Sequence, residues 1–135
     1  ERQGDIQGIS LAISNRLDMR LHPDQIAPGE SDQAEVCGWI RLKDGMPPSA
    51  RSLMLFSDAF PPSVFPRLGI VGWVPTIELT VHVRQRPAPG WIKGRFRTED
   101  VAAGRMIETG ALWDSANTLV AQSRQLGLVL QSSLG

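Results

Sequence analysis

The side chain that is hardest to explain by packing alone is Asp58, which stands beside Phe56, Ala59 and Phe60 in an apolar segment. A negative charge is unfavourable near the C-terminus of a helix, and a buried carboxylate is costly unless it has a partner. Asp58 could cap free N–H groups at the turn that follows. It could instead act as a general base, because apolar surroundings raise the pKa of a carboxyl group. The residues alone leave both interpretations open.

Other reactive groups are few, and their contexts exclude several classes of enzyme. No Gly-x-Ser-x-Gly elbow, phosphate-binding Gly-Lys-Ser/Thr or dinucleotide-binding Gly-x-Gly-x-x-Gly motif occurs. His22 and His82 lie in unrelated contexts without metal-ligand spacing. Cys37 is the single cysteine, so no internal disulfide can form, and its place in a predicted strand favours a core thiol over a nucleophile. We therefore expect no metal and no cofactor.

Alternating apolar and polar residues predict six strands, which would position these groups. The predicted ranges are 13–21, 34–42, 76–84, 91–98, 105–113 and 119–130. In the third range, Ile77 is expected on the buried face with Leu79, Val81 and Val83, while Thr76 is expected on the opposite face.

One helix is predicted between the second and third of these strands. Ser49 is a suitable N-cap, and Pro61-Pro62 must end the helix because proline removes a backbone donor. The segment is apolar on several sides, so we expect it to be buried. One helix against a largely antiparallel sheet predicts an α+β fold in a single domain over residues 1–135, with 1–12 as a lead-in segment.

Composition limits the possible partners. Fourteen basic residues balance 14 acidic ones, so nucleic acid and membrane are not expected as partners. No apolar run approaches the roughly 20 residues that span a bilayer, and no signal peptide is visible. We expect a cytoplasmic protein.

Five short motifs in a fixed order resemble the C-terminal half of the type II, double-hotdog acyl-CoA thioesterases. The resemblance extends from about Arg16 to the end of the chain, and each motif alone is weak. The motifs are Phe56-Ser57-Asp58-Ala59-Phe60-Pro61-Pro62, Trp73-Val74-Pro75-Thr76-Ile77-Glu78-Leu79-Thr80, Arg86-Pro87-Ala88-Pro89-Gly90-Trp91, Leu112-Trp113-Asp114 and Leu119-Val120-Ala121-Gln122-Ser123-Arg124-Gln125.

The resemblance implies a hotdog fold, with a sheet of about five to six strands wrapped around one central helix. It also implies that Asp58, Thr76 and Gln125 hold and activate the water that attacks an acyl-CoA thioester. A carboxylate can take the proton, while a hydroxyl and an amide orient the water. Without the resemblance, Thr76 and Gln125 would be read as ordinary strand residues.

Members of that family carry two hotdog halves, so the resemblance implies a second half or a homodimer as partner. Two other functions remain open, namely a non-catalytic acyl-CoA-binding or dimerisation half and a hotdog hydratase or dehydratase. The latter needs an Asp/His pair, for which neither histidine has the expected context. The basic residues are expected on a solvated sheet face, with coenzyme A phosphates as a less favoured ligand; they are Arg84, Arg86, Lys93, Arg95 and Arg97.

Overall fold

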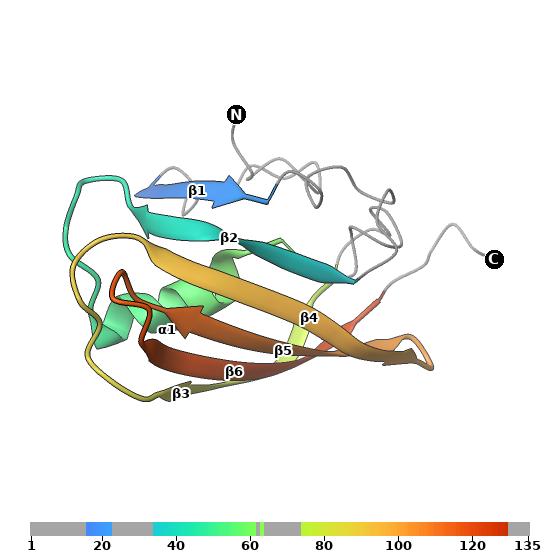
Figure 1. The fold of residues 1–135 in the computed structure, drawn as a ribbon. Coiled ribbons are helices and arrows are strands. Elements are labelled where there is room, and N and C mark those ends of the chain that lie inside the picture. Colours follow the sequence, from blue (N-terminus) through green and yellow to red (C-terminus); the bar gives the residue numbers. More distant parts are fainter. Residues whose placement is uncertain (1–15, 23–33, 62, 64–73, 130–135) are drawn as a thin grey trace.

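The computed structural model describes residues 16–22, 34–61, 63 and 74–129 (Figure 1). The predicted lead-in segment (1–12) and the loop from 23 to 33 lie outside this part of the chain. So do the start of the first predicted strand (13–15) and the last residue of the sixth (130).

The elements follow the order that the sequence predicts. They are β1 (Leu17–Leu21), β2 (Glu35–Leu42), α1 (Ala50–Ala59), β3 (Thr76–Val83), β4 (Ile92–Ala102), β5 (Arg105–Trp113) and β6 (Leu119–Leu128). β4 continues past the predicted end at residue 98, because Ala103 and Gly104 close a tight hairpin to β5. Both turn residues adopt positive φ, of 54° and 74°, which is typical of such two-residue turns.

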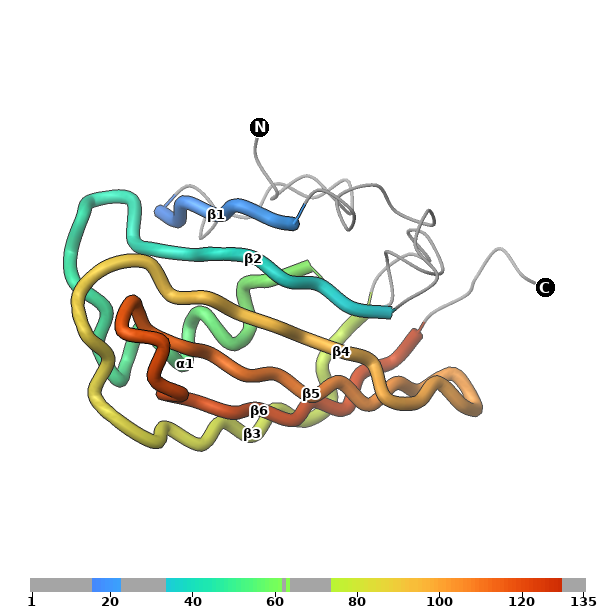
Figure 2. Tube along the Cα trace, viewed as in Figure 1, coloured from blue at the N-terminus to red at the C-terminus, as the bar shows by residue number. Residues whose placement is uncertain are grey.

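In the described part of the chain, the strands form one antiparallel sheet of six, in the order β1-β2-β4-β5-β6-β3. The sheet curves around α1, which packs on its inner face against β3, β5 and β6 (Figures 1 and 2). This is the predicted α+β hotdog fold. β3 pairs with β6, so the last strand lies between β5 and β3.

The core lies between α1 and the inner face of the sheet. Leu53 and Phe56 of α1 are fully buried, as are Ile40 of β2 and Ile92 of β4. Burying a side chain of this size contributes about 1.5–3 kcal/mol. The inner faces of β2 and β4 therefore contribute to the core.

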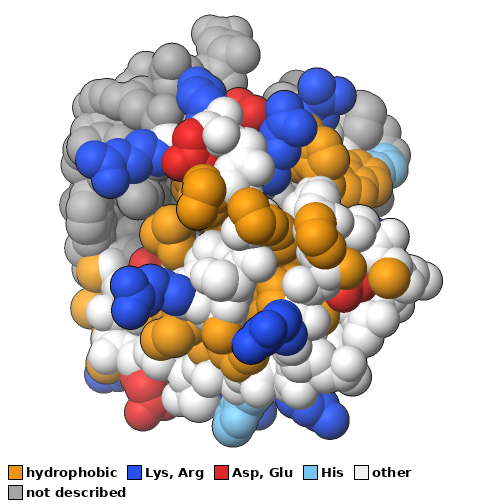
Figure 3. All heavy atoms as spheres, turned by 90° about the vertical axis from the view of Figure 1, so that its left-hand side faces the viewer, with side chains coloured by type: hydrophobic (Ala, Val, Ile, Leu, Met, Phe, Trp, Pro, Cys, Tyr) orange, Lys and Arg blue, Asp and Glu red, His pale blue; other side chains and the backbone are white. Residues whose placement is uncertain are grey.

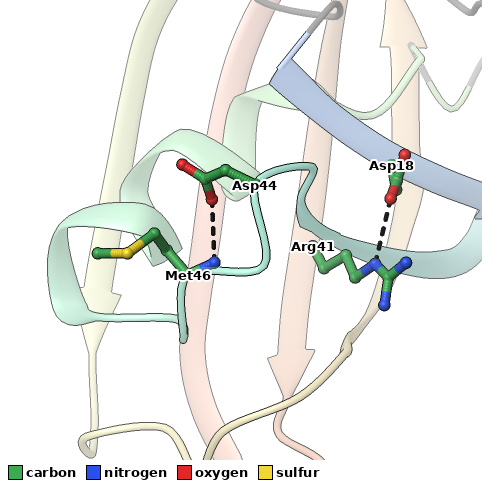
Figure 4. Close-up of polar contacts among 4 residues, drawn as sticks. All are labelled: Asp18, Arg41, Asp44 and Met46. Carbon is green, nitrogen blue, oxygen red and sulfur yellow. Dashed lines mark hydrogen bonds and ion pairs between the residues drawn. The ribbon is translucent and has the colours of Figure 1, made fainter.

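A capping box starts α1. The Ser49 hydroxyl accepts from the Ser52 amide at 3.2 Å, and the Ser52 hydroxyl accepts from the Ser49 amide at 2.6 Å. Ahead of the helix, the Asp44 carboxylate accepts from the Met46 amide and tightens the turn after β2 (Figure 4). The first turn of α1 is thus fixed by local side chains.

The prediction that α1 is buried is wrong in part. Leu53 is fully buried, but its neighbour Met54 is 57% exposed. Only one side of α1 packs against the sheet, and no further layer covers the other side within the described residues.

Candidate active site

Thr76 and Gln125, which are far apart in the sequence, meet on the sheet. The side-chain amide Nε2 of Gln125 donates a hydrogen bond to the hydroxyl Oγ1 of Thr76. Gln125 is 9% exposed, so its polar group is held in an almost fully buried position. The structure therefore joins two of the three residues singled out in the sequence.

A β-bulge brings Thr76 to this position. Thr76 pairs with Gly127 and Glu78 pairs with Leu126, so Ile77 is the extra residue on β3. The expectation that Ile77 lies on the buried face is wrong, since its side chain is 51% exposed. Simple alternation would place Thr76 on the outer face, but the bulge puts it on the same side as Gln125.

A polar row crosses the mainly apolar inner face of the sheet. Thr98 of β4 lies opposite Glu108 of β5, and Glu108 lies opposite Gln125 of β6. Residues opposite one another in adjacent strands share a face, so these three side chains are neighbours. Glu108 therefore lies directly beside the amide that binds Thr76.

Glu108 is buried and held by Ser63, which follows α1. Its Oε2 accepts from the Ser63 amide at 2.9 Å and from the Ser63 hydroxyl at 2.6 Å. The hydroxyls of Ser63 and Thr98 lie 2.6 Å apart, which extends the network to β4. Burial raises the pKa of Glu108, the two Ser63 hydrogen bonds oppose that rise, and the negative charge of Asp58 adds to it.

Asp58 lies in the last turn of α1, close enough to Glu108 for their charges to interact. Its side chain is exposed at the surface, yet apolar surroundings partly desolvate the carboxyl group and raise its pKa. Among described residues no hydrogen bond joins Asp58 to Thr76 or Gln125. The capping alternative gains no support from Ser63, whose amide donates to Glu108.

The end of α1 is anchored two residues beyond Asp58. The rings of Phe60 and Phe96 lie 4.8 Å apart between centroids. Gly94 leaves the room for this contact, because a Cβ atom there would lie 2.7 Å from the Phe60 ring. Packing of Phe60 against β4 thus holds the end of α1 against the sheet, and with it the position of Asp58.

Glu108 was not singled out from the sequence, although a signal was present. It lies on the inward side of β5, between Met106 and Gly110, and both Glu108 and Met106 are buried. A charged residue at an inward position of an alternating strand requires a buried partner or a functional role.

The remaining polar candidates lie away from this site. His82 lies opposite Gln122 on the outer face of β3 and is exposed, and the described residues contain no cluster that could hold a metal.

Lys93, Arg95 and Arg97 occupy the outer face of β4, as predicted. On the side of the molecule drawn in Figure 3, basic side chains lie in several places, some beside acidic ones and others among apolar and neutral ones. None of the described helices is long and apolar enough to cross a membrane.

The fold and the site together define a hotdog domain with a carboxylate on its helix and a hydroxyl–amide pair on its sheet. Residues 2–129 match the family model of the acyl-CoA thioesterase C-terminal domain, so the chain belongs to that family.

Solved structures with a similar fold include a Thermobifida fusca YX protein assigned as a thioesterase II. It is 37% identical with a TM-score of 0.74, and the match covers 85% of this chain and 46% of that protein. A hot dog fold protein of unknown function from Alicyclobacillus acidocaldarius has a TM-score of 0.79 at 22% identity, over 87% of this chain and 46% of the other. The latter likeness supports the fold alone.

An uncharacterized protein of Mycobacterium tuberculosis is 31% identical over 91 residues, which is 67% of this chain and 31% of that protein. The chain thus spans about a third of the length of this curated relative and less than half of the two solved proteins.

Proposed function

We propose that the domain hydrolyses acyl-CoA thioesters to a free acid and coenzyme A, using water activated by Asp58. The observation that carries this proposal is the hydrogen bond between Gln125 and Thr76 on the sheet face against which α1 packs. Membership of the acyl-CoA thioesterase C-terminal domain family supports the same substrate class.

Each of the three groups has a distinct role in the proposed reaction. The Asp58 carboxylate takes a proton from water as the water oxygen attacks the thioester carbonyl carbon. The Thr76 hydroxyl and the Gln125 amide orient that water. When the tetrahedral intermediate collapses, the C–S bond breaks and the proton passes from Asp58 to the coenzyme A sulfur.

We propose that the domain is one half of a double-hotdog assembly, completed by a second hotdog half or a second copy of this chain. β3 is an edge strand, and large apolar side chains are exposed on it and on α1; these are Met54 (57%), Ile77 (51%) and Val83 (40%). Exposed edges and apolar patches of this kind favour association. Sedimentation of the chain as a clean monomer at micromolar concentration would contradict this assembly.

The test of the reaction is release of free coenzyme A from a panel of acyl-CoA thioesters. Asp58→Asn should nearly abolish turnover while circular dichroism shows an unchanged fold. Asp18→Asn is a matched control, because Asp18 forms an ion pair with Arg41 at 3.1 Å on the sheet surface (Figure 4). Equal turnover of wild type and Asp58→Asn would contradict the role of Asp58.

A non-catalytic acyl-CoA-binding half is the second candidate function. It is favoured by the position of Asp58, which has no hydrogen bond to Thr76 or Gln125 within the described part of the chain. Saturable acyl-CoA binding without coenzyme A release, in this chain and in its complex with a second half, would support it. A hydratase is less favoured, because His82 lies on the outer face of the sheet. A cytoplasmic location stays a prediction.

A further inference from the structure

We propose that Glu108 is a positioning residue for Asp58. Glu108 lies opposite Gln125 and binds Ser63, and this contact holds the chain that follows α1 against β5. This inference rests on the proposed function, because its kinetic test measures thioester hydrolysis. The link between Glu108 and Asp58 can also be measured without turnover.

Ser63 links Glu108 to the chain that follows Asp58. Asp58 and Ser63 are five residues apart, on either side of the end of α1. Ser63 is fully buried. Its amide nitrogen and its hydroxyl oxygen donate hydrogen bonds to Glu108 Oε2, at 2.9 and 2.6 Å. Two hydrogen bonds to one carboxylate oxygen fix the chain on the far side of Asp58, while Phe60 anchors it between the two.

Strand pairing places Glu108 beside the Thr76–Gln125 pair. Glu108 lies opposite Gln125, whose amide binds Thr76. One carboxylate therefore touches the segment that follows Asp58 and neighbours the pair that would hold the water. Displacing Glu108 would move Asp58 relative to Thr76 and Gln125, and small misplacements of a catalytic group are costly in rate.

The charges around Glu108 make the link to Asp58 measurable. The described groups that face Glu108 from neighbouring elements are Ser63, Thr98 of β4, Gln125 of β6 and Asp58 of α1. Asp58 is the one charged group among these four. Arg97, Glu99 and Arg124 of the same strands are exposed. Two interacting carboxyl groups titrate as a pair, so each senses the ionisation of the other.

The kinetic test is a double-mutant cycle. Glu108→Ala should lower kcat about ten- to hundred-fold with KM nearly unchanged. Glu108→Gln, whose amide oxygen can still accept from Ser63, should recover most of that loss. If Glu108 acts through Asp58, Glu108→Ala should have no further effect in the Asp58→Asn background. Loss of the same factor in both backgrounds, or loss of thermal stability with kcat unchanged, would overturn the proposal.

Two further measurements keep the test decisive if Glu108→Ala does not fold or the chain does not hydrolyse thioesters. Ser63→Ala removes one of the two bonds to Glu108 and should lower kcat in the same Asp58-dependent way. Carbon-13 NMR of the Asp58 carboxyl group needs no activity. In the wild type this signal should titrate in two steps, and Glu108→Gln should remove the second step. A single, identical step in both proteins would overturn the link even if thioester hydrolysis is established.

Discussion

The Gln125 amide donates to the Thr76 hydroxyl across the β3–β6 strand pair. If this pair orients the attacking water, Thr76→Val should lower kcat about ten- to hundred-fold. Thr76→Ser should retain most activity because it keeps the hydroxyl. Thr80→Val is a matched control. Thr80 is on the same strand as Thr76, but it lies opposite the exposed Arg124 of β6. Steady-state kinetics of the three variants checks the prediction, and equal losses for Thr76→Val and Thr80→Val would contradict it.

Deleting Ile77 should leave Thr76 on the inner face of the sheet. Ile77 is the extra residue of the bulge, so without it Thr76 would directly precede Glu78 and could still pair with Gly127 in a regular strand. The deletion variant should therefore keep the contact with Gln125 and most of its kcat. Ile77→Thr keeps the bulge and changes only an exposed side chain, so it should also stay active. Steady-state kinetics of both variants checks this, and a folded deletion variant that has lost most of its kcat would contradict it.

The rate should fall at low pH as Asp58 becomes protonated. Partial desolvation raises the pKa of Asp58, and only its ionised form can accept a proton from water. The acid limb of kcat/KM should therefore lie above the pH at which an exposed aspartate titrates. A pH–rate profile from acid to neutral pH checks this. A flat profile over that range would be inconsistent with Asp58 as the base.

Glu108 should make the fold less stable as pH rises. Its pKa is raised in the folded protein by burial, so folding favours the protonated form. The contribution of Glu108 to the free energy of unfolding is fully present below the pKa that Glu108 has in the unfolded chain. It is lost as pH rises through the pKa that Glu108 has in the folded protein. Glu108→Gln cannot ionise and should show a weaker pH dependence in urea unfolding. A dependence identical to that of wild type would mean that another group is responsible.

Gly94→Ala should reduce both stability and turnover. The added Cβ would lie 2.7 Å from the Phe60 ring, so Phe60 and the end of α1 must shift. Overpacking of this kind costs about 1–3 kcal/mol. Thermal unfolding and kcat measured together check the prediction, and Phe60→Leu in the same chain should restore part of the stability. Unchanged values for both quantities would show that Phe60 does not fix Asp58.

Much of the fold could be predicted from the sequence, because alternation and capping are local. The pattern from Arg105 to Trp113 gave β5 its observed bounds, and Ser49 is the observed N-cap. The bulge at Ile77 could not be predicted, since it depends on how β3 pairs with β6, a strand that comes much later in the chain.

The candidate site was predictable only in part, and for a similar reason. Asp58 stood out as a carboxylate in apolar surroundings, whereas Thr76 and Gln125 depended on a family resemblance. The row that joins Glu108 to Gln125 arises from the register of two strands. Register depends on the turn between two strands and on the pattern of both, so it cannot be predicted from either strand alone.

The position of β6 between β5 and β3 also has a consequence for folding during synthesis. Asp58 and Thr76 leave the ribosome before Leu119–Leu128, the strand with which β3 pairs. Until β6 is made, β3 has no partner strand in the sheet described here, and Gln125 cannot reach Thr76. Such long-range pairings form late, because a long loop must close first. The hydroxyl–amide pair should therefore be among the last parts of the nascent domain to assemble.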